Sequence, residues 1–270
     1  MSQRSSGWWW TAGVVVVAAA IAGWLYYAHQ KAQTAAPPAA ATPAPASTAP
    51  PPIRHPIERV AGGPAPASTA PLPALGDSDA AVLQALSALP GADGLQALLL
   101  PQAIIPRIVA TVDALPRRQL GTNIVPLRAP PGTFQVAEAG SRRVISDRNA
   151  ERYAAYMRLV GAVDTRALVA WYVHYYPLFQ QAYRELGYPK GYFNDRLVAV
   201  IDHLLAAPQP APPIALEQPK VHYTYADPSL EALSVGQKAM IRVGADNEVR
   251  LKAKLRELRA ALAGQPLPAR

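Results

Sequence analysis

The sequence predicts a mainly α-helical protein: one N-terminal transmembrane helix, a disordered Ala/Pro linker, and a compact helical domain with a small β-hairpin and short extended segments. Three observations support this fold class. Residues 8–27 are apolar and uncharged, residues 28–76 are dominated by Ala, Pro, Ser and Thr, and apolar residues recur every three or four positions over residues 77–263. That spacing gathers apolar side chains on one face of a helix. Short tails, 1–7 and 264–270, complete the chain.

The apolar segment reads WWWTAGVVVVAAAIAGWLYY. About 20 such residues are what a helix needs to cross a hydrocarbon core of about 30 Å. Aromatic residues stand at both of its ends, where their rings favour the membrane interfaces. A cleaved signal peptide would have a shorter apolar region and small residues at its cleavage site, whereas residues 24–27 are bulky. We therefore expect a single-pass protein of a bacterial inner membrane, anchored by residues 8–27.

The orientation of this span depends on few charges. Arg4 and the terminal amine precede it and Lys31 follows it, so the preference of positive residues for the cytoplasmic side nearly balances. We expect the amino terminus inside and the domain in the periplasm, because the next segment suits a long reach from the membrane.

The linker at residues 28–76 contains two related sequences, APPAAATPAPASTAPPP and GPAPASTAPLP. This composition has too little apolar bulk to offset the entropy of the chain, so we expect it to stay unfolded. Proline favours extended polyproline II at about 3.1 Å per residue, which sets a reach of roughly 140 Å for some 45 residues. Such a spacer suits a domain that must work across the periplasm or in the cell wall.

Seven helices are expected in the domain, from apolar spacing and from capping residues. They cover residues 78–89, 94–115, 148–163, 165–186, 193–207, 228–244 and 247–262. Caps are expected at Asp77, Asp164 and Asp227. Two prolines interrupt the second helix, and Pro177 is expected to kink the fourth. Residues 133–136 and 142–145 predict a hairpin, and residues 214–225 predict extended structure.

The segment from Trp171 to Leu205 organises the domain. Residues 171–193 carry nine of the chain's twenty aromatic side chains. Large rings supply much of the burial energy of a small domain, so we expect those up to residue 188 to form the core. The junction that follows, where polar residues meet aromatic ones, is the candidate binding surface. It consists of Tyr188, Tyr192, Asn194, Asp195 and Arg196.

One alternative makes Asp195 the acid or base of a hydrolase directed at the cell wall. Asp195 and Asp202 are seven residues apart and so share one helix face about 10 Å apart along its axis. Glycosidases hold their carboxyl groups nearer together, about 5 Å apart when they retain configuration and about 6.5–9.5 Å when they invert it. Helix capping or pairing with Arg196 is the simpler interpretation of these carboxylates.

A second candidate surface is a basic stripe on the last helix, formed by Lys252, Arg256 and Arg259. It could contact phospholipid, a wall polymer or nucleic acid, or it could simply be a solvated helix face. The whole chain has a formal charge of +8, but the domain is only mildly basic, and nucleic-acid binders concentrate Lys and Arg more strongly. A cytoplasmic nucleic-acid-binding domain is therefore the weaker alternative.

Several kinds of catalytic site lack their residues in this sequence. There is no cysteine, so thiolate catalysis and Cys-ligated zinc are excluded. No histidine pair at i and i+4, no Gly-rich phosphate loop and no GxSxG motif occurs. We therefore expect no catalytic residues, no metal site and no cofactor.

The residues also resemble a known family. YPLFQQAYRELGYPKGYFNDRLVAVIDHLL, QPKVHYTYADPSLEALSVGQKAMIRVG and KAKLRELR are similar to a bacterial domain-of-unknown-function family, number 3014. The similarity extends over about residues 72–262 and includes the layout of one N-terminal span and a linker. It implies a bacterial membrane context, and no activity, ligand or catalytic residue.

Together these observations favour a non-catalytic, membrane-anchored envelope protein whose helical domain holds a protein partner or a cell-wall polymer. The anchor, the long linker and the missing catalytic motifs all point in this direction.

Overall fold

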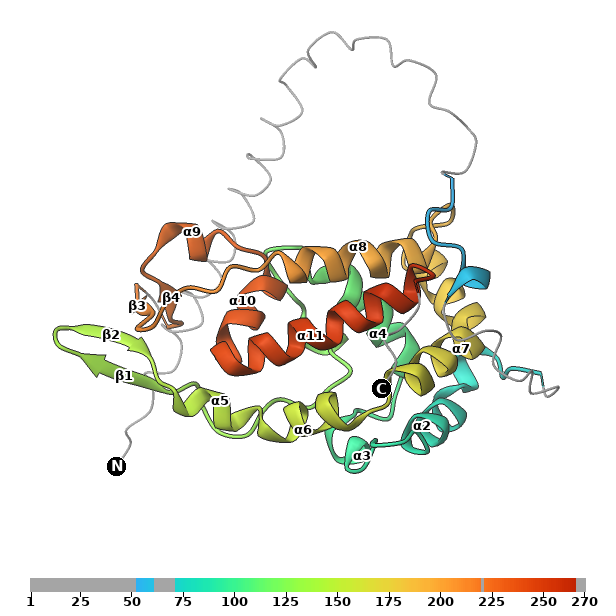
Figure 1. The fold of residues 1–270 in the computed structure, drawn as a ribbon, viewed down its shortest axis with the longest axis horizontal. Coiled ribbons are helices and arrows are strands. Elements are labelled where there is room, and N and C mark those ends of the chain that lie inside the picture. Colours follow the sequence, from blue (N-terminus) through green and yellow to red (C-terminus); the bar gives the residue numbers. More distant parts are fainter. Residues whose placement is uncertain (1–51, 61–70, 220, 266–270) are drawn as a thin grey trace, which may run out of the picture. The chain divides into compact units, whose positions relative to one another are not determined.

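Helices make up most of the part of the chain that the computed structural model describes, namely residues 52–60, 71–219 and 221–265 (Figure 1). The α-helices are α2 Asp79–Ser87, α3 Leu95–Leu98, α4 Ile104–Ala114, α5 Arg148–Arg152, α6 Ala154–Ala162, α7 Thr165–Glu185, α8 Phe193–Leu205, α9 Pro228–Glu231, α10 Val235–Arg242 and α11 Ala245–Leu262. Three 3-10 turns are η1 Ile57–Arg59, η2 Leu75–Asp77 and η3 Thr122–Ile124. The mainly helical prediction is confirmed for these residues.

The expected membrane span lies outside the described residues. Within them, no helix has both the length and the apolar character that crossing a membrane requires.

The chain breaks between α3 and α4 where the prolines predicted it. The side chain that caps the start of α4 belongs to α2. Both carboxylate oxygens of Asp79 accept backbone N–H groups at the start of α4, from Ala103 at 2.6 Å and from Ile104 at 2.8 Å. Asp77, the expected cap of α2, instead ends the 3-10 turn η2, and Ser78 precedes the helix without a side-chain cap bond. The cap at Asp77 was therefore wrong.

The longest helix, α7, has the ends that the sequence predicted. The Asp164 side chain accepts the backbone N–H of Ala167 at 2.8 Å, and Gly187 follows the helix with a positive φ of 115°. Pro177 lies inside α7, which continues through it to Glu185.

Two expected helices are each divided in two. The run predicted over 148–163 becomes α5 and α6, with Tyr153 between them. The run predicted over 228–244 becomes α9, capped by Asp227, and α10, which starts afresh at Ser234. The Ser234 side chain accepts the N–H of Gln237 and so caps the start of α10. This second cap lies inside the apolar pattern, which is why the predicted helix is divided.

The extended segments form one antiparallel sheet in the order β1-β2-β3-β4. Its strands are Val136–Ala139, Arg142–Ile145, Ala215–Glu217 and Thr224–Tyr225. The hairpin β1-β2 is confirmed, although β1 begins where the predicted strand ended. β2 also pairs with β3, Val144 opposite Ala215, and so links two regions that the sequence analysis treated separately.

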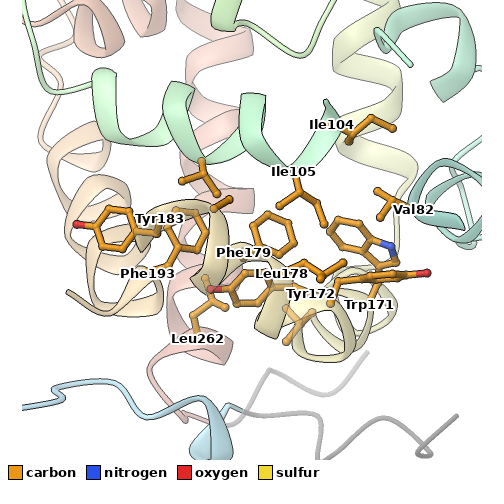
Figure 2. Close-up of a cluster of buried hydrophobic side chains, with 14 of the residues drawn as sticks. Val82, Ile104, Ile105, Trp171, Tyr172, Leu178, Phe179, Tyr183, Phe193 and Leu262 are labelled. Carbon is orange, nitrogen blue, oxygen red and sulfur yellow. The ribbon is translucent and has the colours of Figure 1, made fainter. Parts of the chain in front are cut away.

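Aromatic rings from α7 and the start of α8 form the centre of the main core (Figure 2). Phe179 and Phe193 stack with ring centroids 5.6 Å apart, and Tyr172 and Tyr183 pack beside them. Ile104 and Ile105 of α4 are completely buried against this cluster. The aromatic segment is thus the core, as its composition predicted.

The boundary of the folded domain requires correction. Residues 52–60 and 71–76 fall within the expected unfolded linker, yet they belong to the same compact unit as the helices of the domain. Val60 and Leu75 are buried members of the main core, and Ile57 packs against it. A few apolar residues are enough to order a proline-rich segment against the domain, because the domain supplies the surface that buries them.

Candidate functional site

The five residues of the predicted binding surface lie between the end of α7 and the first turn of α8, and four of them divide between two clusters. Asn194 and Asp195 hold residues 52–60, which we call the strap. Tyr188 and Arg196 converge on a buried carboxylate of α4. Tyr192 is half-buried and precedes the first residue of α8.

Asp195 binds the main chain of the strap. Its Oδ2 accepts the backbone N–H of Arg54 at 3.0 Å, and its Oδ1 accepts that of His55 at 2.7 Å. Hydrogen bonds to an ionised acceptor are roughly twice as strong as neutral ones. Both oxygens of Asp195 therefore hold the main chain of the strap.

Asn194 completes this main-chain contact from a fully buried position. Its Nδ2 donates to the carbonyl of His55 at 2.8 Å and to that of Leu262 at 3.2 Å, at the end of α11. Its Oδ1 accepts the hydroxyl of Tyr172 at 3.3 Å. One side chain thus ties the strap, α11 and the aromatic core together, and burial of an amide is tolerated because its polar atoms are bonded.

Beyond His55 the strap contacts the domain through apolar side chains. Ile57 packs on the main core and Val60 is only 4% exposed. Gly264, after α11, lies so close that a Cβ built on it would be 2.7 Å from the carbonyl oxygen of Arg59. The strap therefore contacts the domain through its main chain at Asn194 and Asp195 and through the apolar side chains of Ile57 and Val60 at the main core.

Gln180 of α7 fixes the start of α8, where the sequence offered Asp195 as a helix cap. Its Oε1 accepts the backbone N–H of Phe193 and the hydroxyl of Tyr176, each at 2.9 Å. Its Nε2 donates to the carbonyl of Gly191 at 2.7 Å. Because Gln180 takes the first free donor of α8, the two following polar side chains are available to bind the strap.

The second cluster surrounds Asp113, which is 2% exposed and which the sequence analysis missed. Arg196 donates to Asp113 Oδ1 at 3.0 Å and to its carbonyl at 2.8 Å, and the Tyr188 hydroxyl donates to Oδ2 at 3.1 Å. Arg117 pairs with the same carboxylate. The spacing of Asp113 and Arg117, four residues apart, was the only sequence signal for this cluster.

The basic stripe predicted on α11 is not one surface. Lys252 is buried: its Nζ donates to the carbonyl of Ala207 at 2.6 Å and lies 2.8 Å from Glu248 Oε1. That oxygen has an ion-pair distance to Lys252 but no hydrogen bond of good geometry. Arg259 forms a bidentate pair with Asp202, and Arg256 is exposed. Placing Lys252 on an anion-binding face was wrong.

Two clefts lie away from the predicted residues. The larger, about 590 Å³, is bounded by α5, the start of α11 and the link at Pro210 and Pro212. A cleft of about 330 Å³ beside the sheet is lined by Phe134, Tyr153 and Tyr223, among others. None of the five junction residues lines either cleft. Within the described part of the chain, no group of three or more His, Asp or Glu side chains is arranged to hold a metal ion.

The pKa of the Tyr176 phenol is raised by its surroundings near Asp195. Burial raises the pKa of Tyr176 to about 12, and the nearby carboxylates of Asp195 and Glu58 act in the same direction. Burial also raises the pKa of Tyr172 well above its ordinary value. Both phenols therefore stay neutral in the folded protein at pH values where an exposed tyrosine ionises.

Alkaline conditions are expected to destabilise the domain between pH 10 and about 12. A phenol with a raised folded-state pKa leaves stability unaffected below the unfolded pKa of about 10, and stability is lost as pH rises toward the folded value. Urea unfolding followed by circular dichroism from pH 8 to 11 measures this loss. Tyr176→Phe should show a shallower decline, and an equally steep one would contradict the assignment to Tyr176.

The comparisons with known proteins give one result. The family described as "Protein of unknown function (DUF3014)" matches residues 104–259, which is more than half of the chain. The chain belongs to this family. The DUF3014 match begins with α4 and ends inside α11, so it contains Asn194 and Asp195 while the strap and α2 precede it. No curated protein and no solved structure matches the chain.

Proposed function

We propose that this DUF3014 protein is a membrane-anchored binding protein of the bacterial cell envelope, and that its domain holds a protein partner or a cell-wall polymer without catalysis. One observation carries the proposal: Asn194 and Asp195, the most polar pair beside the aromatic core, bind peptide main chain. Two acceptor oxygens and one amide donor, directed at successive peptide groups, suit the recognition of a polypeptide chain.

The sequence before the strap supports the membrane part of the proposal. The uncharged residues 8–27 have the length of a membrane span, and a proline-rich segment follows them. Alkaline phosphatase fused after Arg270 tests the orientation, because that enzyme is active only in the periplasm. Activity supports an envelope-facing domain, and its absence from a stable fusion contradicts it.

Binding is tested with the full chain in mild detergent. Purified peptidoglycan and an envelope lysate are offered separately, and retained material is compared with that held by an unrelated single-pass protein. Retention by either above this control is the expected result. No retention from both would contradict the proposed function.

A cell-wall hydrolase that uses Asp195 is the main alternative to this proposal. We expect no clearing of wall material in a zymogram, from the wild type or from Asp195→Asn, because both oxygens of Asp195 already accept backbone N–H groups. Clearing by the wild type that the variant loses would restore the hydrolase. The nucleic-acid alternative is weakened because Lys252 is buried and paired with Glu248.

A further inference from the structure

The strap contacts the domain in the way a bound peptide does. It is nine residues long, and residues 61–70 separate it in sequence from the rest of the folded unit. Its polar contacts with Asn194 and Asp195 use only main-chain groups of Arg54 and His55. Figure 1 shows it in blue beside the end of α8 at which that helix begins.

We propose that the groove formed by Asn194, Asp195 and the end of α11 is a peptide-binding site, which the strap occupies in cis and which a peptide of a partner protein that follows the same turned backbone path can occupy in its place. This inference rests on the proposed function, because it names the kind of partner that the domain holds. The partner peptide offers two successive N–H groups and a carbonyl to Asn194 and Asp195.

Apolar side chains supply the selectivity of the site. Counting along the strap, Ile57 and Val60 follow His55 by two and five residues and are the side chains that pack on the core. Ile53 does not contribute to this packing, because it is 45% exposed and belongs to no core cluster. The groove thus selects a peptide with an aliphatic residue, two intervening residues and a second aliphatic residue, after a main-chain contact.

The affinity of such a site need only be modest. A segment that its own chain holds near its binding site has an effective concentration in the millimolar range, so a dissociation constant below about 1 mM keeps the strap bound most of the time. Two apolar side chains and three hydrogen bonds are enough for that affinity. A partner peptide that binds more tightly, or that is locally concentrated at the membrane, then displaces the strap.

The test uses the full chain in detergent with a recognition sequence for a specific protease placed within residues 61–70. After cleavage the strap is held by the groove alone. A fluorescent synthetic peptide of residues 52–60 is added, and its binding is measured by anisotropy while release of the N-terminal fragment is followed by size-exclusion chromatography. We expect exchange, with a dissociation constant below about 1 mM. No exchange with 1 mM peptide would overturn the proposal.

Peptide variants test the selectivity without changing the domain. Ile57→Ala and Val60→Ala peptides are expected to bind about tenfold more weakly, while the matched Ile53→Ala peptide binds within about twofold of the parent. Equal binding by all four peptides would contradict selection by side chains. Asp195→Ala in the chain should weaken the parent peptide about tenfold, and circular dichroism checks that this variant keeps its helices.

The outcomes separate this inference from the proposed function. Exchange of the peptide without retention of any envelope protein or polymer supports the groove and contradicts the broader function. Retention of an envelope partner without peptide exchange supports the broader function and contradicts the groove. The binding surface would then lie elsewhere on the domain.

Discussion

Replacing Phe193 with alanine is expected to lower the free energy of unfolding by about 3–5 kcal/mol. The Phe193 ring is completely buried and stacks on Phe179, with Tyr183 at a centroid distance of 5.6 Å. Its removal loses the transfer energy of the ring and leaves a cavity beside the α7 rings that pack against it. Urea unfolding of the full chain in detergent, followed by circular dichroism, measures the change.

Two further variants make the Phe193 result interpretable. Leu186→Ala, on a side chain that is 42% exposed at the end of α7, should change the unfolding free energy by less than about 0.5 kcal/mol. Phe193→Leu should fall between the wild type and the alanine variant, because it retains part of the buried volume. A cost below about 1 kcal/mol for Phe193→Ala would mean that the aromatic cluster is not the core.

Lys252→Met is expected to cost about 3–5 kcal/mol, because it leaves the Glu248 carboxylate buried without its partner. Glu248 is 2% exposed and Lys252 is 6% exposed, and their charged atoms lie 2.8 Å apart. The change also removes the donor to the carbonyl of Ala207. The same urea titration measures the loss.

The control for this prediction is the double variant Glu248→Met with Lys252→Met. Replacing a buried pair by apolar residues of similar size is often neutral, so the double variant should recover most of the stability that the single one loses. Arg259→Met, which breaks the half-exposed pair with Asp202, should cost less than about 1 kcal/mol. A single variant as stable as the wild type would show that Lys252 does not neutralise Glu248.

Local structure was predictable where its cause lies within a few residues. Asp164 and Asp227 cap the helices that follow them, and Gly187 ends α7 with a positive φ. The hairpin around Gly140 was predicted for the same reason, since a turn and two short strands are a local motif. Each capping carboxylate is within three residues of the N–H group that it accepts. The two strands of the hairpin are separated only by their turn.

The contacts of the candidate site residues could not be predicted from the sequence. The residues were identified from composition, as polar side chains beside aromatic ones, and the structure divides them between the strap and Asp113. What they bind could not be inferred, because Arg54 and His55 are about 140 positions away from Asp195 in sequence. Gln180 and Asp113 were missed for the same reason, since partners that define their roles, Phe193 and Arg196, lie further along the chain.

By itself the sequence determined that the domain is mainly helical, that its core is aromatic, that a small hairpin interrupts the helices, and that the chain is a DUF3014 protein. Periodicity, ring content and long matching motifs are properties of contiguous residues. Only the tertiary structure decided that the strap folds, that Lys252 is internal, and that Asp195 recognises main chain. Each of these depends on a surface assembled from distant segments, which alone supplies the burial and the bonding partners that change what a residue does.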